Sequence, residues 1–118
     1  MRILLIEDDP TTARSIELML SHANFNVYLT DMGEEGVDLA KLYDYDLILL
    51  DLDLPGLSGF ELAQHLRNQG YMLPLLAVTA RTDPDLQQQV EAAGIGGFLR
   101  KPVTGELLVE AIARVMGR

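Results

Sequence analysis

The stretch LILLDLDLPG at residues 47–56 runs four apolar residues directly into two acids, Asp51 and Asp53, and then breaks at Pro55-Gly56. A short apolar run without alternation is typical of a strand that is buried on both faces. Such strands occur in parallel sheets whose two faces are covered by helices. The stretch therefore predicts an α/β protein, and it places two carboxylates at the carboxyl end of a central strand.

The rest of the chain repeats this pattern, because short aliphatic runs alternate with helical patterns from end to end. The expected strands cover residues 2–6, 26–30, 47–50, 75–78 and 97–99. Residues 9–10 and 83–84 read as Asp-Pro helix starts, and residues 31–34 and 58–61 fit the spacing of a capping box. The fold class predicted is a doubly wound, five-stranded parallel sheet with five helices.

Composition limits the function. The 118 residues suffice for one domain, expected to span residues 1–118, and the absence of cysteine excludes thiolate metal sites and fits a cytoplasmic location. After Met1-Arg2 only four apolar residues precede Glu7, too few for a signal peptide or a membrane anchor. A formal charge of −9 disfavours direct binding of nucleic acid, whose phosphates would be repelled.

Polar residues follow four of the five expected strands. They are Glu7, Asp8 and Asp9, then Asp51 and Asp53, then Thr79, and finally Lys101. The carboxyl ends of parallel strands share one edge of the sheet, where ligands bind in folds of this class. Carboxylates held close together repel one another unless a cation offsets their charge, and oxygen ligands favour Mg²⁺ over softer metals. The sequence therefore predicts a magnesium site beside a lysine.

This set of groups suits phosphoryl transfer, in which the protein mainly positions groups and neutralises charged oxygens. One carboxylate would attack phosphorus, Mg²⁺ would bridge carboxylate and phosphoryl oxygens, and the lysine and threonine would contact others. The product would be an aspartyl phosphate.

Each residue also has a simpler interpretation when taken alone. Acids at strand ends are often loop residues or helix caps, and Asp9 before a proline fits a cap. Thr79 could be a β-branched strand residue, and Lys101 could belong to an ordinary turn. His22 and His65 fall within helical patterns and are expected to face solvent. The coincidence at four strands favours the site over these separate interpretations.

Four motifs together resemble the receiver domain of two-component response regulators, over essentially the whole chain. They are IEDD at 6–9, LILLDLDLPGLSG at 47–59, AVTA at 77–80 and LRKPV at 99–103. The resemblance implies a flavodoxin- and CheY-like sheet of order 2-1-3-4-5. It also implies a switch that accepts a phosphoryl group from a histidine kinase or a histidine phosphotransfer protein, and that catalyses only its own phosphorylation and dephosphorylation. Residues 1 to about 55 resemble the cell-cycle regulators of alphaproteobacteria more than the second half does.

By position, the resemblance makes Asp51 the phosphoacceptor and a Mg²⁺ ligand, with Asp8 as a second direct ligand. Glu7 would reach the metal through water, and Asp53 would contribute its backbone carbonyl. Lys101 matches the family's lysine, and the bond to Pro102 would be cis.

The same resemblance implies a conformational switch. Thr79 would move toward the phosphoryl group, and Phe98 would reorient with it. The face built by the fourth helix, fifth strand and fifth helix would then change and control an output domain or a target protein. Near the fifth strand this chain has Gly94, Gly96 and Gly97, where DNA-binding members carry acids that pair across their activated dimer.

Asp53 and Arg81 are the predicted tuning residues. Asp53 adds negative charge beside the acceptor, and Arg81, two residues after Thr79, stands where it could offset that charge. Both flank the route by which water would reach the phosphoryl group, so both are expected to affect its lifetime.

Two other functions remain as alternatives. The D-x-D at 51–53 is similar to the motif of haloacid-dehalogenase-like phosphohydrolases, but no acidic pair follows Lys101, and the extra acids precede the motif. The other alternative is a receiver-like binding module that is not phosphorylated.

Overall fold

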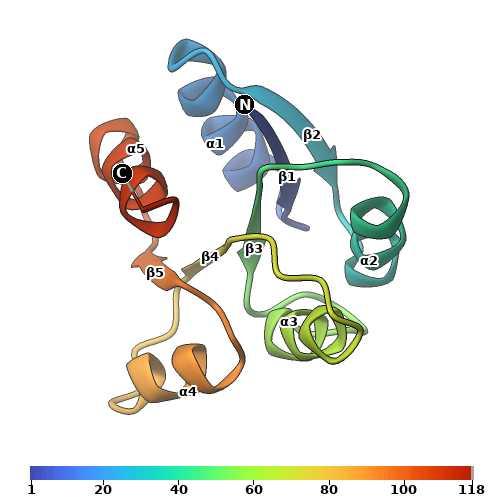
Figure 1. Ribbon diagram of the computed structural model, residues 1–118. Coiled ribbons are helices and arrows are strands. Elements are labelled where there is room, and N and C mark those ends of the chain that lie inside the picture. Colours follow the sequence, from blue (N-terminus) through green and yellow to red (C-terminus); the bar gives the residue numbers. More distant parts are fainter. Residues whose placement is uncertain (118) are drawn as a thin grey trace.

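The computed structural model describes residues 1–117, which form five parallel strands and five helices in strict alternation (Figure 1). The elements are β1 (Arg2–Ile6), α1 (Pro10–His22), β2 (Asn26–Thr30), α2 (Gly33–Leu42), β3 (Leu47–Asp51), α3 (Gly59–Asn68), β4 (Leu75–Thr79), α4 (Leu86–Ala92), β5 (Gly97–Arg100) and α5 (Gly105–Val115). The strands lie in the order β2-β1-β3-β4-β5. The doubly wound sheet predicted from the sequence is confirmed, and β3, β4 and β5 each extend one residue further than expected.

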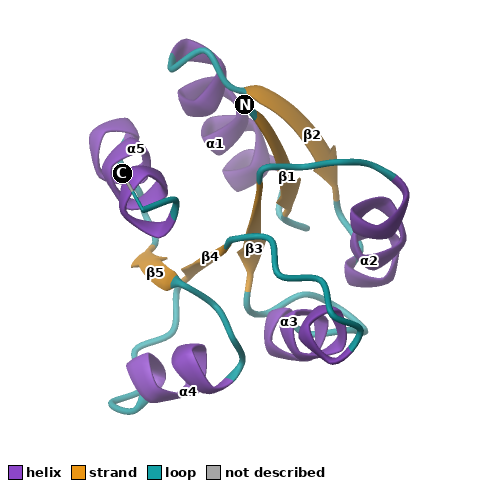
Figure 2. Cartoon of the chain, in the orientation of Figure 1, coloured by secondary structure: helices purple, strands orange, loops and turns teal. Residues whose placement is uncertain are grey.

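Helices cover both faces of the sheet, with α1 and α5 on one face and α2, α3 and α4 on the other (Figures 1 and 2). Alternate residues of β3 supply the two cores: Leu47 and Leu49 pack with α1 and α5, and Ile48 and Leu50 pack with α2 and α3. Every residue of β3 and β4 is buried. This explains why the central strands show no alternation in the sequence.

Two of the four expected helix starts are confirmed. The Asp9 side chain accepts a hydrogen bond from the backbone N–H of Thr12 at 3.0 Å, one turn into α1. Ser58 and Glu61 form a reciprocal capping box at the start of α3.

The other two expected helix starts are wrong. α2 begins at Gly33 with Met32 as N-cap, so Asp31 lies one residue too early to cap it. α4 begins only at Leu86, because residues 84–85 form a turn, and the carboxylate of Asp83 pairs with Arg81 instead of capping a helix. Within residues 1–117, no helix is long and apolar enough to cross a membrane.

Candidate functional site

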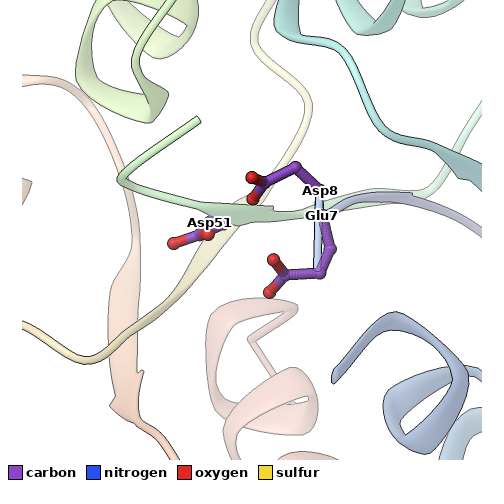
Figure 3. A group of neighbouring side chains, drawn as sticks. All are labelled: Glu7, Asp8 and Asp51. Atoms are coloured by element: carbon purple, nitrogen blue, oxygen red, sulfur yellow. The ribbon is translucent and has the colours of Figure 1, made fainter. Parts of the chain in front are cut away.

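Three carboxylates meet where β1 and β3 end (Figure 3). Glu7 and Asp8 follow β1 directly, and Asp51 is the last residue of β3, which pairs with β1. One carboxylate oxygen from each lies within 4.8 Å of the other two. Glu7 is only 2% exposed and Asp51 only 6%, whereas Asp8 faces solvent. The predicted acidic cluster therefore exists, with one member open to the outside.

Lys101 supplies a positive charge to this cluster. It follows β5 directly and reaches the acids although β5 lies two strands away from β3. Its Nζ lies 2.7 Å from Glu7 Oε1 and 3.4 Å from Asp51 Oδ2. The backbone N–H of Lys101 donates to the carbonyl of Thr79 at 2.8 Å, which fixes the start of the loop after β5. The Lys101–Pro102 bond is cis, as the family resemblance implies.

Burial and mutual contact shift the pKa values of Glu7 and Lys101. Desolvation raises the pKa of Glu7, and the nearby Lys101 and the N–H of Asp9 counteract only part of this rise. For Lys101, burial works to lower the pKa, but the neighbouring Glu7 and Asp51 carboxylates outweigh it and raise the pKa overall. The lysine therefore stays protonated and holds negative charge on a glutamate that burial would otherwise neutralise.

Replacing Lys101 by Met is expected to destabilise the metal-free protein at neutral pH. The change leaves two buried carboxylates without their cation, which we expect to lower the free energy of unfolding by about 1–3 kcal/mol. A group whose folded pKa is raised is best tolerated in its protonated form, so the loss should be large at neutral pH and should shrink as the pH falls through the pKa of Glu7. Urea unfolding of both proteins without divalent metal, at neutral and mildly acidic pH, measures this difference.

The matched control is the same change made in a Glu7→Gln background. With the buried acid already neutral, Lys101→Met should cost less than it does in the original protein. An equal cost in both backgrounds, or a cost that does not vary with pH, would contradict the assigned ion pair.

Thr79 and Asp51 occupy neighbouring strands, with Asp51 paired in register to Val78. Thr79 is fully buried, and its hydroxyl oxygen accepts a hydrogen bond from the backbone N–H of Arg81 at 3.0 Å. Asp51 Oδ1 accepts one from the N–H of Asp53 at 3.2 Å. In both β3 and β4, the backbone N–H two residues after the strand's last residue donates to that residue's side chain and orients it.

Arg81 pairs with two acids near the carboxyl ends of β3 and β4, and we call its ion pair with Asp53 the Asp53–Arg81 clasp. Its guanidinium lies 2.9 Å from Asp53 Oδ1 and 3.2 Å from Asp83 Oδ2, and it stacks over the ring of Phe60 with its central carbon 5.3 Å from the ring centroid. The bond to Asp53 and the charges of both acids raise the pKa of Arg81. Arg100 on β5 donates to the carbonyl of Arg81 at 3.0 Å, which ties the clasp to the edge of the sheet.

The remaining expected residues lie apart from this cluster. Phe98 is half-buried on β5, beside Ala77 of β4, and packs against the core on the side of α3 and α4. His22 and His65 are exposed on α1 and α3, as expected from the sequence.

Sequence reasoning missed three contributors to the site: Phe60 under Arg81, Asp83 as its second acid, and Gly59. The contact with Phe60 arises from the packing of α3 against the loop after β4, whereas Asp83 lies only two residues from Arg81 in the sequence. Gly59 lets the start of α3 approach the end of β3, because a Cβ on it would lie 2.5 Å from the backbone oxygen of Asp51. A glycine at the start of a helix pattern is the sequence signal for this close approach.

The comparisons with known proteins agree with this geometry. The model of the response regulator receiver domain matches residues 3–113. The cell cycle transcriptional regulator CtrA of Caulobacter vibrioides is 46% identical over 118 residues, which is 100% of this chain and 51% of that protein. The chain thus spans about half the length of the curated relatives it matches, and the resemblance to the cell-cycle regulators extends over its whole length.

Solved structures of other proteins match nearly the whole chain, and two of them illustrate the match. A receiver domain of a Pseudomonas aeruginosa sensor histidine kinase, solved with a magnesium ion coordinated in the active site cleft, is 32% identical with a TM-score of 0.90 and covers 99% of this chain and 98% of its own. A Francisella response regulator receiver domain has a TM-score of 0.92 at 23% identity, covering 99% and 97%, and supports the fold alone.

Proposed function

The chain belongs to the response regulator receiver domain family, and on this premise we propose that it is a phosphoacceptor switch in which Asp51 takes a phosphoryl group in the presence of Mg²⁺. The observation that carries the proposal is the position of the Asp51 carboxylate, at the end of a buried strand, within reach of two further carboxylates and of the Lys101 ammonium. The single domain of residues 1–118 and its cytoplasmic location stay predictions from the sequence.

The donor set fits magnesium. Three carboxylates stand against one lysine, and every available ligand atom is oxygen, which suits a small hard cation. Glu7 Oε1 lies 2.7 Å from Lys101 Nζ, and Glu7 Oε2 accepts a hydrogen bond from the N–H of Asp9. Both oxygens of Glu7 are already engaged, which supports Glu7 as an indirect, water-mediated ligand beside Asp8, Asp51 and the carbonyl of Asp53.

In the proposed reaction, an oxygen of Asp51 attacks the phosphorus of a phosphohistidine. The new O–P bond forms as the P–N bond breaks, and the electron pair of that bond returns to the imidazole of the donor. Bound Mg²⁺ would neutralise charge on the phosphoryl oxygens. Lys101, already 3.4 Å from Asp51, neutralises another of these oxygens, and the donor is a histidine kinase or a histidine phosphotransfer protein. Exposed Arg14 and Ser15 on α1 are candidate contacts with it.

The switch begins at Thr79. Its hydroxyl oxygen now accepts from the N–H of Arg81, and a phosphoryl group on Asp51 would offer its O–H a strong acceptor. Movement of Thr79 toward the phosphoryl group would free space for Phe98, whose side chain is only half-buried. This biases a two-state equilibrium of the α4-β5-α5 face, through which an output domain or target protein would respond.

The test uses acetyl phosphate as a small phosphodonor. Incubation with Mg²⁺ should add the mass of one phosphoryl group to the intact protein, and chelation of Mg²⁺ should prevent the addition. Rapid steady release of phosphate without an adduct would support a haloacid-dehalogenase-like hydrolase, and neither result would support the non-phosphorylated binding module.

The Asp53–Arg81 clasp should lengthen the life of the phosphorylated state. Asp53→Asn and Arg81→Ala each break the ion pair that lies next to the acceptor in the chain. Each change should open the approach of water and speed loss of the phosphoryl group about 2- to 10-fold. The measurement is the decay of the intact-mass adduct after removal of acetyl phosphate.

Arg114→Ala is the matched control for this change. Arg114 also pairs with an acid at 3.0 Å, but it lies exposed on α5, away from the site. Its loss should leave the decay rate unchanged. Decay rates that stay at the original value in both Asp53→Asn and Arg81→Ala would remove the clasp from the reaction.

A further inference from the structure

A cavity that is lined by none of the three clustered carboxylates lies between the edge strand β2 and helix α2, which are neighbours at one end of the sheet (Figure 1). Its volume is about 610 Å³, within the range of small-molecule sites. Its lining residues are Arg2, Val27, Tyr28, Leu29, Glu35, Leu39, Tyr43 and Tyr45. Three of the four tyrosines of the chain therefore meet around one arginine.

The guanidinium of Arg2 is held in place but donates to no group of residues 1–117, although the backbone N–H of Arg2 donates to Asp46 Oδ2 at 2.7 Å. Its guanidinium carbon lies 5.1 Å from the ring centroid of Tyr28 and 5.8 Å from that of Tyr45, and these two rings pack edge to face. Its Nε is buried and has no hydrogen-bond partner. Although the chain carries 18 acids, no carboxylate of residues 1–117 forms an ion pair with Arg2. A partly buried cation without an acceptor is costly unless something else meets it.

We propose that this cavity is a ligand site for a small molecule that joins an anionic group to an aromatic ring. The anionic group meets the guanidinium of Arg2, whose planar fork suits a carboxylate or a phosphate. The ring stacks on Tyr43, which is 54% exposed and carries no cation of residues 1–117 over its ring. This site is separate from the acidic cluster and does not depend on phosphorylation of Asp51.

The lining also decides against a cationic ligand. Aromatic rings gathered in this way could bind an ammonium group, but Arg2 already occupies the faces of Tyr28 and Tyr45. Glu35 adds a carboxylate to the lining, where it can accept a hydrogen bond from a ring N–H of the ligand. A nucleoside monophosphate and an indole carboxylate both combine an anion, a flat ring and such an N–H, and they represent the two sources of this chemistry.

The experiment is a titration of the ¹⁵N-labelled protein followed by amide chemical shifts, in buffer without divalent metal. The probes are guanosine monophosphate and indole-3-carboxylate, with guanosine and inorganic phosphate as ring-only and anion-only comparisons. We expect shifts confined to β2, α2 and the start of β1, produced by one of the two combined probes and about tenfold more weakly by either part alone. The probe that binds identifies phosphate or carboxylate as the anion.

Three variants complete the test. Arg2→Gln and Tyr43→Ala should each weaken binding about tenfold, whereas Tyr71→Ala should not, because Tyr71 is equally a surface tyrosine but lies outside the cavity. Tyr43 is exposed enough that its truncation leaves the fold intact, so the test stands even if Arg2→Gln is unstable. The proposal is overturned if no combined probe binds or if binding survives both Arg2→Gln and Tyr43→Ala. It is also overturned if the cavity proves to be a contact between two copies of the chain.

Discussion

Asp51→Asn is expected to abolish the phosphoryl adduct completely. The amide of asparagine keeps the size and the place of the carboxylate at the end of β3, but its oxygen is a poor nucleophile and it brings no negative charge to the metal. The other groups of the site stay where they are, since Glu7 and Lys101 contact each other directly. The measurement is the intact mass after incubation with acetyl phosphate and Mg²⁺, in which the original protein should gain one phosphoryl group and the variant none.

Asp53→Asn is the matched control for this experiment. It removes a carboxylate two residues further on, from an exposed position, and it should leave the adduct in place while changing its lifetime. A persistent adduct in Asp51→Asn would mean that another side chain accepts the group. The outcome separates the acceptor from its neighbour within the D-x-D pair, which the sequence alone presents as two similar acids.

The same substitution should raise stability. Removing one of three neighbouring carboxylates relieves repulsion that, among residues 1–117, Lys101 alone offsets by an ion pair. We therefore expect Asp51→Asn to unfold at a higher urea concentration than the original protein when no divalent metal is present, and to lose most of this advantage when Mg²⁺ is added. A lost adduct together with a higher midpoint would exclude misfolding as the cause of lost phosphorylation.

The strands of the sheet could be predicted from the sequence because burial on both faces leaves unbroken apolar runs. The unbroken apolar run at residues 47–50 predicted a strand buried on both faces, and the rule that ligands bind at the carboxyl ends of parallel strands then placed Glu7, Asp51 and Lys101 at one edge. The helix starts at residues 31 and 83 failed for a different reason. Capping requires one particular position: Asp31 lies one residue before Met32, the N-cap of α2, and Asp83 lies two residues before Asp85, the N-cap of α4.

The tyrosine-lined cavity shows the same limit. Arg2 begins β1, whereas Tyr28 lies in β2, and Tyr43 and Tyr45 lie in the loop between α2 and β3. These residues follow no shared period and match no motif, so only the packing of β1, β2 and α2 brings them together. The acidic site could be predicted because its residues belong to motifs at strand ends. The tyrosine-lined cavity could not, because its residues share no motif and are brought together only by the packing at β2.

Gly59→Ala is expected to produce the largest loss of stability among single methyl additions at a helix start in this protein. Gly59 is the first residue of α3, and a Cβ there would lie 2.5 Å from the backbone oxygen of Asp51 and 2.7 Å from the Cα of Leu52. Both are backbone atoms at the end of β3, which cannot rotate away as a side chain could. Either α3 or the end of β3 must move, and we expect a loss of about 3 kcal/mol in the free energy of unfolding.

Gly105→Ala is the matched control, because Gly105 is likewise the first residue of its helix, α5. A Cβ there would lie 3.8 Å from the side chain of Met19, an ordinary contact, so the change should be nearly neutral. Urea unfolding of both variants measures the difference. Equal stabilities would show that α3 is free to shift. The obstructing oxygen belongs to Asp51, the proposed phosphoacceptor. We therefore expect the Gly59 variant to be phosphorylated more slowly than the Gly105 variant under conditions where both are folded. A slower rate would link the close packing of α3 to the position of Asp51.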